Sequence, residues 1–168
     1  MSSQGVQSAH QEFFALAAYE EEDTPWDIAA AQPRVEAALR NGGFLLGESA
    51  ASADVSSGLL QGVAAADLGC GFGYHTRLLA ELSCEAVGLD LSHAAIRGAQ
   101  RRTRDWIDQG DARSSPPQFL QADLLDSSAV QAVLGARTFD LLLDASTFHC
   151  FNDEERESYL NTLDMLSH

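Results

Sequence analysis

A glycine-rich stretch at residues 67–73 is the part of this sequence whose spacing indicates a chemical role most directly. It reads Asp-Leu-Gly-Cys-Gly-Phe-Gly, after an apolar run at 63–68 and before leucines at helical spacing. Glycines between a strand and a helix permit positive φ angles and let a ligand approach backbone N–H groups closely. A glycine triplet alone would be a weak signal, but in this context the stretch predicts a ligand-binding loop.

The spacing of the glycines narrows the class of ligand. A dinucleotide fingerprint needs Gly-x-Gly-x-x-Gly, whereas Tyr74 stands three positions after Gly71 and the spacing here is Gly-x-Gly-x-Gly. Binding of a pyrophosphate would gain little from Asp67, the acid immediately before the loop. A carboxylate at that point suits a ligand with an ammonium group, held directly or through water.

Acidic residues recur at the ends of the apolar runs. Strands are expected at 63–68, 85–90, 118–122 and 139–144, and each ends in or next to an acid, namely Asp67, Asp90, Asp123 and Asp144. Ligands of open α/β sheets bind at the carboxyl ends of the strands. The alternative is four unrelated surface aspartates, since the loops that lead into helices favour Asp as a cap.

Two of these acids fit particular parts of a nucleoside. Asp90 closes the second strand 21 residues after Gly69, where a carboxylate can accept hydrogen bonds from both ribose hydroxyls and would repel a 2′-phosphate. Asp123 could accept a hydrogen bond from an adenine amino group. The ligand so described is an adenosyl compound with a positively charged tail and no phosphates, which is the chemistry of S-adenosylmethionine.

The elements that must position these residues alternate between strand and helix. Helices are expected from Tyr74, after a Ser92 cap, after an Asp126 or Ser127 cap, and around Tyr159 to Leu166. Strands that alternate with helices at this spacing are typical of right-handed βαβ units. The sequence therefore predicts an α/β fold with a Rossmann-like parallel sheet and flanking helices.

From about Gly62 to its end the chain resembles the class I S-adenosylmethionine-dependent methyltransferases. The stretch 67–73 resembles the family's first motif, 87–92 its second-strand motif, 122–123 its adenine-side acid and 139–144 its fourth strand. The resemblance implies S-adenosylmethionine as cofactor. It also implies cofactor-binding roles for residues of these motifs, which are Asp67, Gly69, Cys70, Gly71, Gly73, Asp90, Leu91, Asp123, Leu124 and Asp144.

A narrower similarity connects the chain with the thiopurine-methyltransferase-like small-molecule branch of that family. It rests on Thr24-Pro-Trp-Asp with Gln32-Pro33, and on the stretch 144–149. The resemblance implies that Trp26 covers the cofactor, and the alternative is that Trp26 anchors the first two helices. His149 is expected to face the substrate as a base or a contact, or else to be a structural histidine. Cys150 is expected to be a small buried hydrophobe.

The amino-acid composition of the chain limits the classes of partner that it can be expected to bind. The 168 residues contain 25 acidic and 10 basic residues, all ten of them Arg, for a net charge of −15. Nucleic-acid phosphates and anionic membranes both need a basic face, so neither is an expected partner. Three cysteines without a CxxC pair, no signal-like start and no long apolar run indicate a soluble cytoplasmic protein. Neither a disulfide framework nor a metal site is expected.

The chain divides into three zones that differ in amino-acid composition. Residues 1–46 are expected to form a helical cap segment, 47–61 a flexible linker of small polar residues, and 62–168 the cofactor-binding domain. The family's sheet normally continues with a fifth strand and an antiparallel hairpin, so the resemblance implies that the C-terminal strands are missing here. The fourth strand would then be an open edge that invites self-association.

The reaction implied by the resemblance is methyl transfer from S-adenosylmethionine to a small-molecule acceptor. Because the methyl group is already activated, the protein mainly aligns the reactants and excludes water, and no catalytic residue is assigned. Two alternatives stay open. One is a nicotinamide-dependent oxidoreductase, and the other is a module that binds adenosylmethionine without catalysis.

Overall fold

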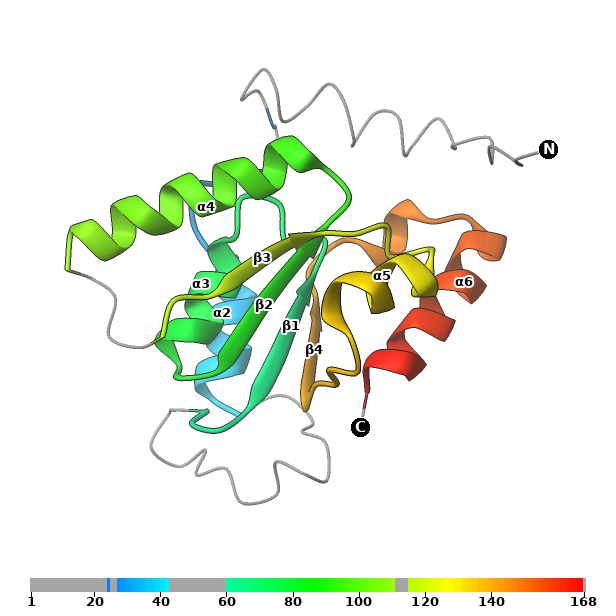
Figure 1. Ribbon diagram of the computed structural model, residues 1–168. Helices are drawn as coiled ribbons and strands as arrows, with labels where there is room; N and C mark the ends of the chain where they lie inside the picture. Colours follow the sequence, from blue (N-terminus) through cyan, green and yellow to red (C-terminus); the bar gives the residue numbers. More distant parts are fainter. Residues whose placement is uncertain (1–23, 25–26, 43–59, 111–114, 168) are drawn as a thin grey trace.

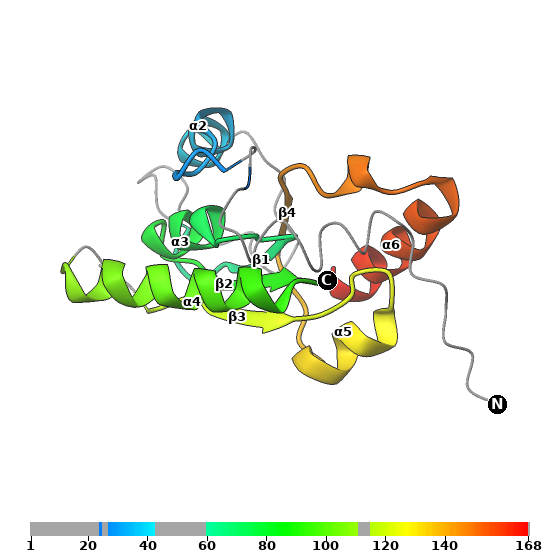
Figure 2. The same cartoon turned by 90° about the horizontal axis from the view of Figure 1, so that it is seen from above.

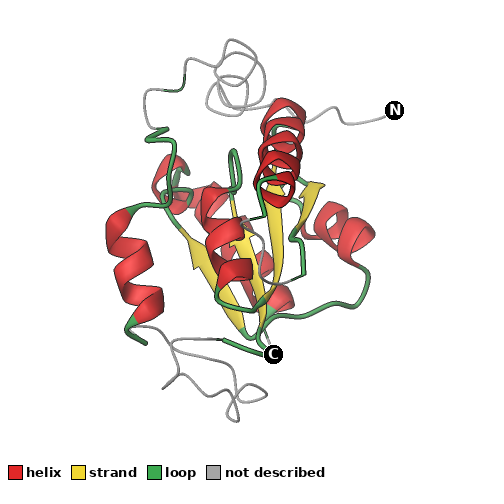
Figure 3. Ribbon diagram, turned by 90° about the vertical axis from the view of Figure 1, so that its left-hand side faces the viewer, coloured by secondary structure: helices red, strands yellow, loops and turns green. Residues whose placement is uncertain are grey.

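Four parallel strands form a sheet whose two faces are covered by helices (Figures 1 and 3). The computed structural model describes residue 24 and residues 27–42, 60–110 and 115–167. The strands are β1 (Ala64–Leu68), β2 (Glu85–Asp90), β3 (Gln118–Gln121) and β4 (Leu141–Asp144), in the order β3-β2-β1-β4. The expected α/β fold with a parallel sheet is therefore confirmed.

Three helices connect successive strands, as parallel pairing requires, and they are α3 (Tyr74–Glu81), α4 (His93–Asp108) and α5 (Ser127–Leu134). Among the described residues α2 (Pro33–Arg40) precedes β1, and a 3-10 turn η4 (Phe148–Cys150) and α6 (Asp153–Leu166) follow β4. Figure 3 shows helices on either side of the yellow strands.

Alternate strand residues face two separate layers of the core. Ala65, Ala86 and Leu141 pack with Leu78 and Leu79 of α3 on one face. On the other face the strands pack against α5 and α6 through a second apolar cluster, which includes Ala66, Leu68, Val87, Leu89, Val130, Tyr159 and Leu166. Side chains that alternate between two covered faces explain why these short strands have apolar residues at successive positions.

Side-chain caps fix where the helices begin. Ser92 accepts a hydrogen bond from the Ala95 N–H at 3.3 Å, as the expected cap of α4. Asp126 accepts from the N–H groups of Ser128 at 3.0 Å and Ala129 at 3.1 Å. These bonds satisfy donors that the first turn of a helix leaves without an intrahelical partner.

The structure differs from the sequence-based expectation at several boundaries. β4 begins at Leu141 rather than Phe139, whose pairing is an isolated bridge with Ser167. Leu60 is buried and its N–H donates to the Leu82 carbonyl, while the rest of the linker expected at 47–61 lies outside the described residues up to residue 59. Leu160, expected on the apolar face of the last helix, is 50% exposed. Of the helical cap segment expected at 1–46, only residue 24 and residues 27–42 are among the described residues.

Candidate functional site

A cavity of about 370 Å³ lies at the carboxyl ends of the strands. Residues at the ends of the four strands or shortly after them line it, in the ranges 69–72, 90–91, 123–124, 145–147 and 149–151. The segment before α2, Tyr74 and His75 at the start of α3, and Glu155 in the first turn of α6 complete the described lining. The volume lies in the range of about 300–1,000 Å³ that is usual for small-molecule sites, at the place where open α/β sheets bind ligands.

The glycine-rich loop forms one wall of this cavity through Gly69, Cys70 and Gly71. The φ angles of Gly69 and Gly71 are +74° and +52°, which L side chains rarely adopt. A Cβ added to Gly69 would stand 2.0 Å from Thr147 Oγ1. Glycine is therefore required at Gly69 both by the backbone conformation and by the close approach of the loop after β4.

Asp90, at the end of β2, is bonded to this loop. Its Oδ2 atom accepts a hydrogen bond from the Gly71 N–H at 2.8 Å, and Oδ1 accepts from the Ser92 N–H at 2.8 Å. Burial raises the pKa of the Asp90 carboxyl, and the two backbone donors oppose that effect. Each carboxylate oxygen can accept a further bond, and the residue lines the cavity together with Leu91.

Asp123 and Leu124 reach the cavity from the connection between β3 and α5. The Asp123 Oδ1 atom accepts from the Leu125 N–H at 2.9 Å, which fixes the side chain while Oδ2 accepts no bond from a described residue. Leu124 is buried and belongs to the core beneath the cavity. The structure thus brings together Gly69, Cys70, Gly71, Asp90, Leu91, Asp123, Leu124 and His149 of the residues that the sequence singled out.

Asp67 and Gly73 do not line the cavity. The Asp67 side chain is buried beneath the loop, where it accepts a hydrogen bond from Thr76 Oγ1 at 2.6 Å. Burial raises its pKa to about 7, and the nearby Asp90 and Asp144 raise it as well, while the Thr76 bond lowers it. Gly73 packs against the sheet, since an added Cβ would stand 2.5 Å from the Phe119 ring. Both residues therefore support the loop from below.

Asp144 organises the loop after β4 instead of lining the cavity. Its carboxylate accepts bonds from the N–H groups of Thr147 at 2.8 Å and Phe148 at 3.0 Å, and from the Tyr159 hydroxyl at 2.7 Å. Thr147 in turn donates its hydroxyl to the Leu68 carbonyl at 2.7 Å. Asp144 therefore holds the loop in place from outside the cavity.

Four polar residues of the same loop line the cavity, namely Ser146, Thr147, His149 and Cys150. Ser146 has a φ angle of +96°, unusual for a residue with a side chain. The Cys150 Sγ atom lies 3.5 Å from the Ser146 carbonyl and 3.7 Å from His149 Nε2. Burial, with Asp144 nearby, raises the pKa of the Cys150 thiol. Cys150 is only partly buried and lines the cavity, so it is more accessible than the sequence indicated.

The segment before α2 crosses to the cavity and is tied to α3. The Gln32 N–H donates to His75 Nε2 at 2.9 Å, and burial lowers the pKa of His75. Asp27, Ile28 and Gln32 line the cavity from this side. Trp26 lies outside the described residues, so its expected contact with a cofactor stays a prediction.

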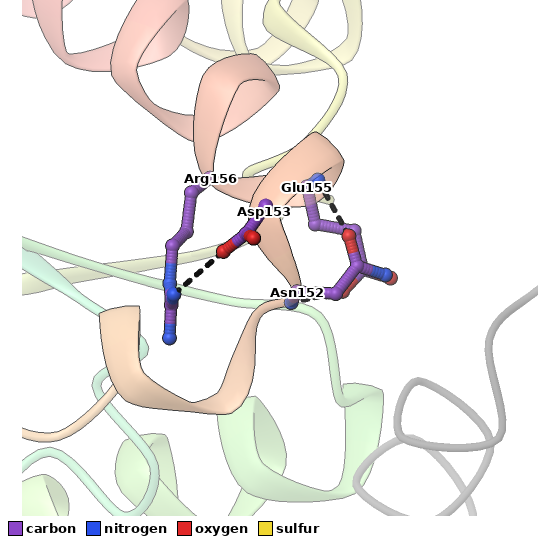
Figure 4. Close-up of polar contacts among 4 residues, drawn as sticks. All are labelled: Asn152, Asp153, Glu155 and Arg156. Atoms are coloured by element: carbon purple, nitrogen blue, oxygen red, sulfur yellow. Dashed lines mark hydrogen bonds and ion pairs between the residues drawn. The ribbon is translucent and has the colours of Figure 1, made fainter.

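Glu155 is a cavity residue that the sequence analysis did not identify. It belongs to a capping box at the start of α6, in which Asn152 Oδ1 accepts from the Glu155 N–H at 3.0 Å and Glu155 Oε2 accepts from the Asn152 N–H at 2.9 Å (Figure 4). The Asn-x-x-Glu spacing was a signal for the cap. That this carboxylate lines the cavity could not be read from the spacing.

The described residues contain no group of three or more His, Cys, Asp or Glu side chains placed to hold a metal ion. None of the helices in the described part of the chain is long and apolar enough to cross a membrane.

Comparison with known proteins identifies a family. Residues 65–166 match a family described as a methyltransferase domain. A structure concerned with the conversion of a disulfide bond into a thioacetal group during echinomycin biosynthesis shares 29% identity and a TM-score of 0.62, over 90% of this chain and 54% of that one.

Two other solved structures share the fold. Magnesium protoporphyrin IX methyltransferase from Synechocystis PCC 6803, with bound S-adenosylmethionine (SAM), is 18% identical, with a TM-score of 0.64, over 99% of this chain and 74% of that chain. A DhpI-SAM-HEP complex is 21% identical, with a TM-score of 0.58, over 100% of this chain and 64% of that chain. The chain thus spans about half to three quarters of the length of these structures.

Proposed function

Because this chain belongs to the methyltransferase-domain family, we propose that it binds S-adenosylmethionine in the cavity and transfers the methyl group to a small acceptor. The observation that carries the proposal is the bond between Gly71 and Asp90. It places a glycine-rich backbone and a carboxylate side by side on the cavity wall, where one nucleoside and its tail can reach both.

The residues of the cavity fit each part of this cofactor. Gly69 and Gly71 line the cavity without side chains, so the methionine tail can approach their backbone. Asp90 has acceptor capacity for the two ribose hydroxyls, and Asp123 with Leu124 would receive the adenine amino group and ring. Bound there, the cofactor would supply a methyl group already activated for transfer. Asp67, Gly73 and Asp144 would act by holding the loops.

A nicotinamide dinucleotide fits the same wall less well. The loop has Gly-x-Gly-x-Gly spacing, and no Arg or Lys is among the described residues that line the cavity. A pyrophosphate would therefore meet the carboxylates Asp90 and Asp123 without a compensating cation. These features favour a cofactor without phosphates.

The part of the cavity lined by the segment before α2 and the loop after β4 would receive the acceptor. Ile28, His149 and Phe151 of these segments line the cavity, and they offer apolar contact and an imidazole. Enclosure of the acceptor there would align it and exclude water.

A small acceptor is supported by the cavity volume and by the relative at 29% identity, whose structure concerns echinomycin biosynthesis. The net charge of −15 disfavours nucleic acid and anionic membranes as partners. The cysteines Cys70, Cys84 and Cys150 are all free thiols, which suits a reducing compartment such as the cytoplasm.

Two organisational proposals accompany this function. We retain 62–168 as the cofactor-binding domain, which the family match at 65–166 supports. Self-association through β4 is the second proposal, because β4 pairs with β1 and with no other strand of the described residues. Light scattering across a dilution series tests it.

Calorimetry with S-adenosylhomocysteine and NAD tests the cofactor assignment. We expect saturable binding of S-adenosylhomocysteine and none of NAD, and tighter binding of NAD would contradict the proposal. Turnover of labelled S-adenosylmethionine with small acceptors then separates an enzyme from a module that binds the cofactor without catalysis.

A further inference from the structure

The charged side chains around the cavity have one sign. Its described lining includes the carboxylates Asp27, Asp90, Asp123 and Glu155 and no Arg or Lys. In the sequence, residues 1–33 contain no Arg or Lys, and neither do residues 138–155. The segment before α2 and the segment after β4 therefore have no Arg or Lys side chain to offer an anionic acceptor.

Two arginines that lie close in sequence to lining residues make contacts elsewhere. Arg77 donates to the Phe72 carbonyl at 3.2 Å and lies over the Tyr74 ring at 4.6 Å, although it also acts electrostatically on Asp27. Arg156 pairs with Asp153 at 3.0 Å (Figure 4) and lies over the Phe148 ring at 5.2 Å. Neither residue lines the cavity.

Two of the carboxylates retain an oxygen for an acceptor. Asp27 uses Oδ1 to accept the Ala29 N–H at 2.7 Å, and Glu155 uses Oε2 to accept the Asn152 N–H at 2.9 Å. Their second oxygens accept no hydrogen bond from a described residue. Figure 2 shows α2 and α6 well apart, with the connection from β4 through η4 between them. Asp27, before α2, and Glu155, in the first turn of α6, thus line the cavity from separate elements.

From this arrangement, and resting on the proposed function, we infer that the acceptor is a small amine that binds as its ammonium ion. Asp90 and Asp123 are assigned to the nucleoside, which leaves Asp27 and Glu155 for the acceptor. The bound cofactor carries a single net positive charge against four lining carboxylates. The remaining negative field attracts a cation and repels a carboxylate or phosphate.

His149 is placed to complete the chemistry that an ammonium acceptor requires. The ammonium has no lone pair, so it first gives one proton to the imidazole of His149, which lines the same cavity. The nitrogen lone pair then forms the new N–C bond as the S–C bond breaks, and the electron pair of that bond stays on sulfur. The products are a methylated ammonium ion, a neutral thioether and a protonated imidazole that returns its proton to water.

Binding to the protein loaded with S-adenosylhomocysteine tests the inference independently of turnover. The probes are phenethylamine, phenethyl alcohol and 3-phenylpropionate, which share an apolar group and differ in charge. Glu155→Gln keeps an oxygen that can accept the Asn152 N–H, and Glu154→Gln is the matched control because Glu154 is exposed and does not line the cavity. Calorimetry at low and high salt gives the Kd of each probe.

We expect phenethylamine to bind at least tenfold more tightly than 3-phenylpropionate at low salt, with a difference that shrinks at high salt. Glu155→Gln should weaken amine binding by about five- to tenfold, and Glu154→Gln should leave it unchanged. Equal effects of the two variants, tighter binding of the carboxylate, or no saturable amine binding would each overturn the inference. If the unaltered protein does not bind S-adenosylhomocysteine, that result would instead contradict the proposed function.

Discussion

The backbone N–H of Gly71 donates a hydrogen bond to Asp90 Oδ2 at 2.8 Å, which joins the loop after β1 to the end of β2. The other Asp90 oxygen holds the Ser92 N–H at the start of α4. One buried carboxylate therefore fixes two loops of the cavity at once. Its removal affects the shape of the site as well as any direct contact with a ligand.

Replacement of Asp90 by alanine is expected to weaken S-adenosylhomocysteine binding by about 2–4 kcal/mol, roughly 30- to 1,000-fold in Kd, because two charge-assisted bonds to the ribose are lost. Asp90→Ala also removes the bonds to Gly71 and Ser92, so it should lower the thermal unfolding temperature.

Asp126→Ala is the matched control, since Asp126 also accepts two backbone N–H groups but lies outside the cavity. It should reduce stability and leave affinity unchanged. Calorimetry well below the unfolding temperature of each variant separates the two effects. An Asp90→Ala protein that is folded and binds normally would show that the ribose is bound elsewhere.

The pattern of the sequence predicted the strands well where both faces are covered. Residues 85–90 were expected as a strand and are β2, because apolar residues there face two core layers. The fourth strand was expected to begin at Phe139, but its pairing with β1 begins at Leu141. An apolar residue next to a strand is as readily buried by a helix, and Phe139 packs in the cluster that α6 shares.

The site was predictable in its types of residue but less so in their roles. Aspartates were expected at the ends of all four strands, and Asp90 and Asp123 do line the cavity. Asp67 instead accepts a hydrogen bond from Thr76 of α3, and Asp144 accepts one from Tyr159 of α6. Sequence spacing sets the position along the strand, whereas these partners come from elements brought close only by folding.

Gly69→Ala is expected to destabilise the protein by about 1–3 kcal/mol, because a left-handed φ angle and a clash with Thr147 act together. Removal of the Thr147 hydroxyl in the double variant Gly69→Ala/Thr147→Ala should relieve part of that cost. A coupling of at least about 0.5 kcal/mol is expected from a double-mutant cycle of urea unfolding.

Gly110→Ala gives the cost of the backbone conformation alone, since Gly110 has a φ angle of +79° and no atom within 4 Å of an added Cβ. It should be clearly milder than Gly69→Ala. Strict additivity between Gly69→Ala and Thr147→Ala would mean that the loop after β4 moves away freely and does not constrain the glycine-rich loop.

Asp67→Asn is expected to flatten the dependence of stability on pH. Burial raises the folded-state pKa of Asp67 to about 7 from an ordinary value of 3.8. Between these values the folded chain binds this proton more tightly than the unfolded chain, so the contribution of Asp67 to stability falls as pH rises from about 4 to about 7. Asparagine removes the charge and keeps an oxygen for the Thr76 hydroxyl.

Thermal unfolding at pH 5 and pH 8 measures this effect. The unfolding temperature of Asp67→Asn should fall less between the two pH values than that of the unaltered protein, and the variant should be at least as stable at pH 8. Asp108→Asn, on the exposed end of α4, controls for the change in net charge. Identical pH profiles for Asp67→Asn and Asp108→Asn would contradict a raised pKa at Asp67.

Tyr159→Phe tests whether α6 controls the loop that carries His149 and Cys150. The Tyr159 hydroxyl donates to Asp144 at 2.7 Å, and Asp144 holds the N–H groups of Thr147 and Phe148. Loss of one hydrogen bond should cost about 1 kcal/mol of stability and loosen the loop. Cys150, packed against the Ser146 carbonyl, should then react faster with iodoacetamide, as mass spectrometry of the labelled site would measure.

S-adenosylhomocysteine affinity should change by less than about twofold in Tyr159→Phe, because the glycine-rich loop and Asp90 make no contact with the hydroxyl. Tyr74→Phe is the control for the removal of a tyrosine hydroxyl, since Tyr74 lines the cavity and has no bond to Asp144. Cys70 and Cys84 are buried, so their labelling reports unfolding and not loop motion. Faster labelling of all three cysteines would mean that Tyr159 supports the whole fold. An unchanged Cys150 rate in a destabilised variant would mean that Asp144 holds the loop without help from α6.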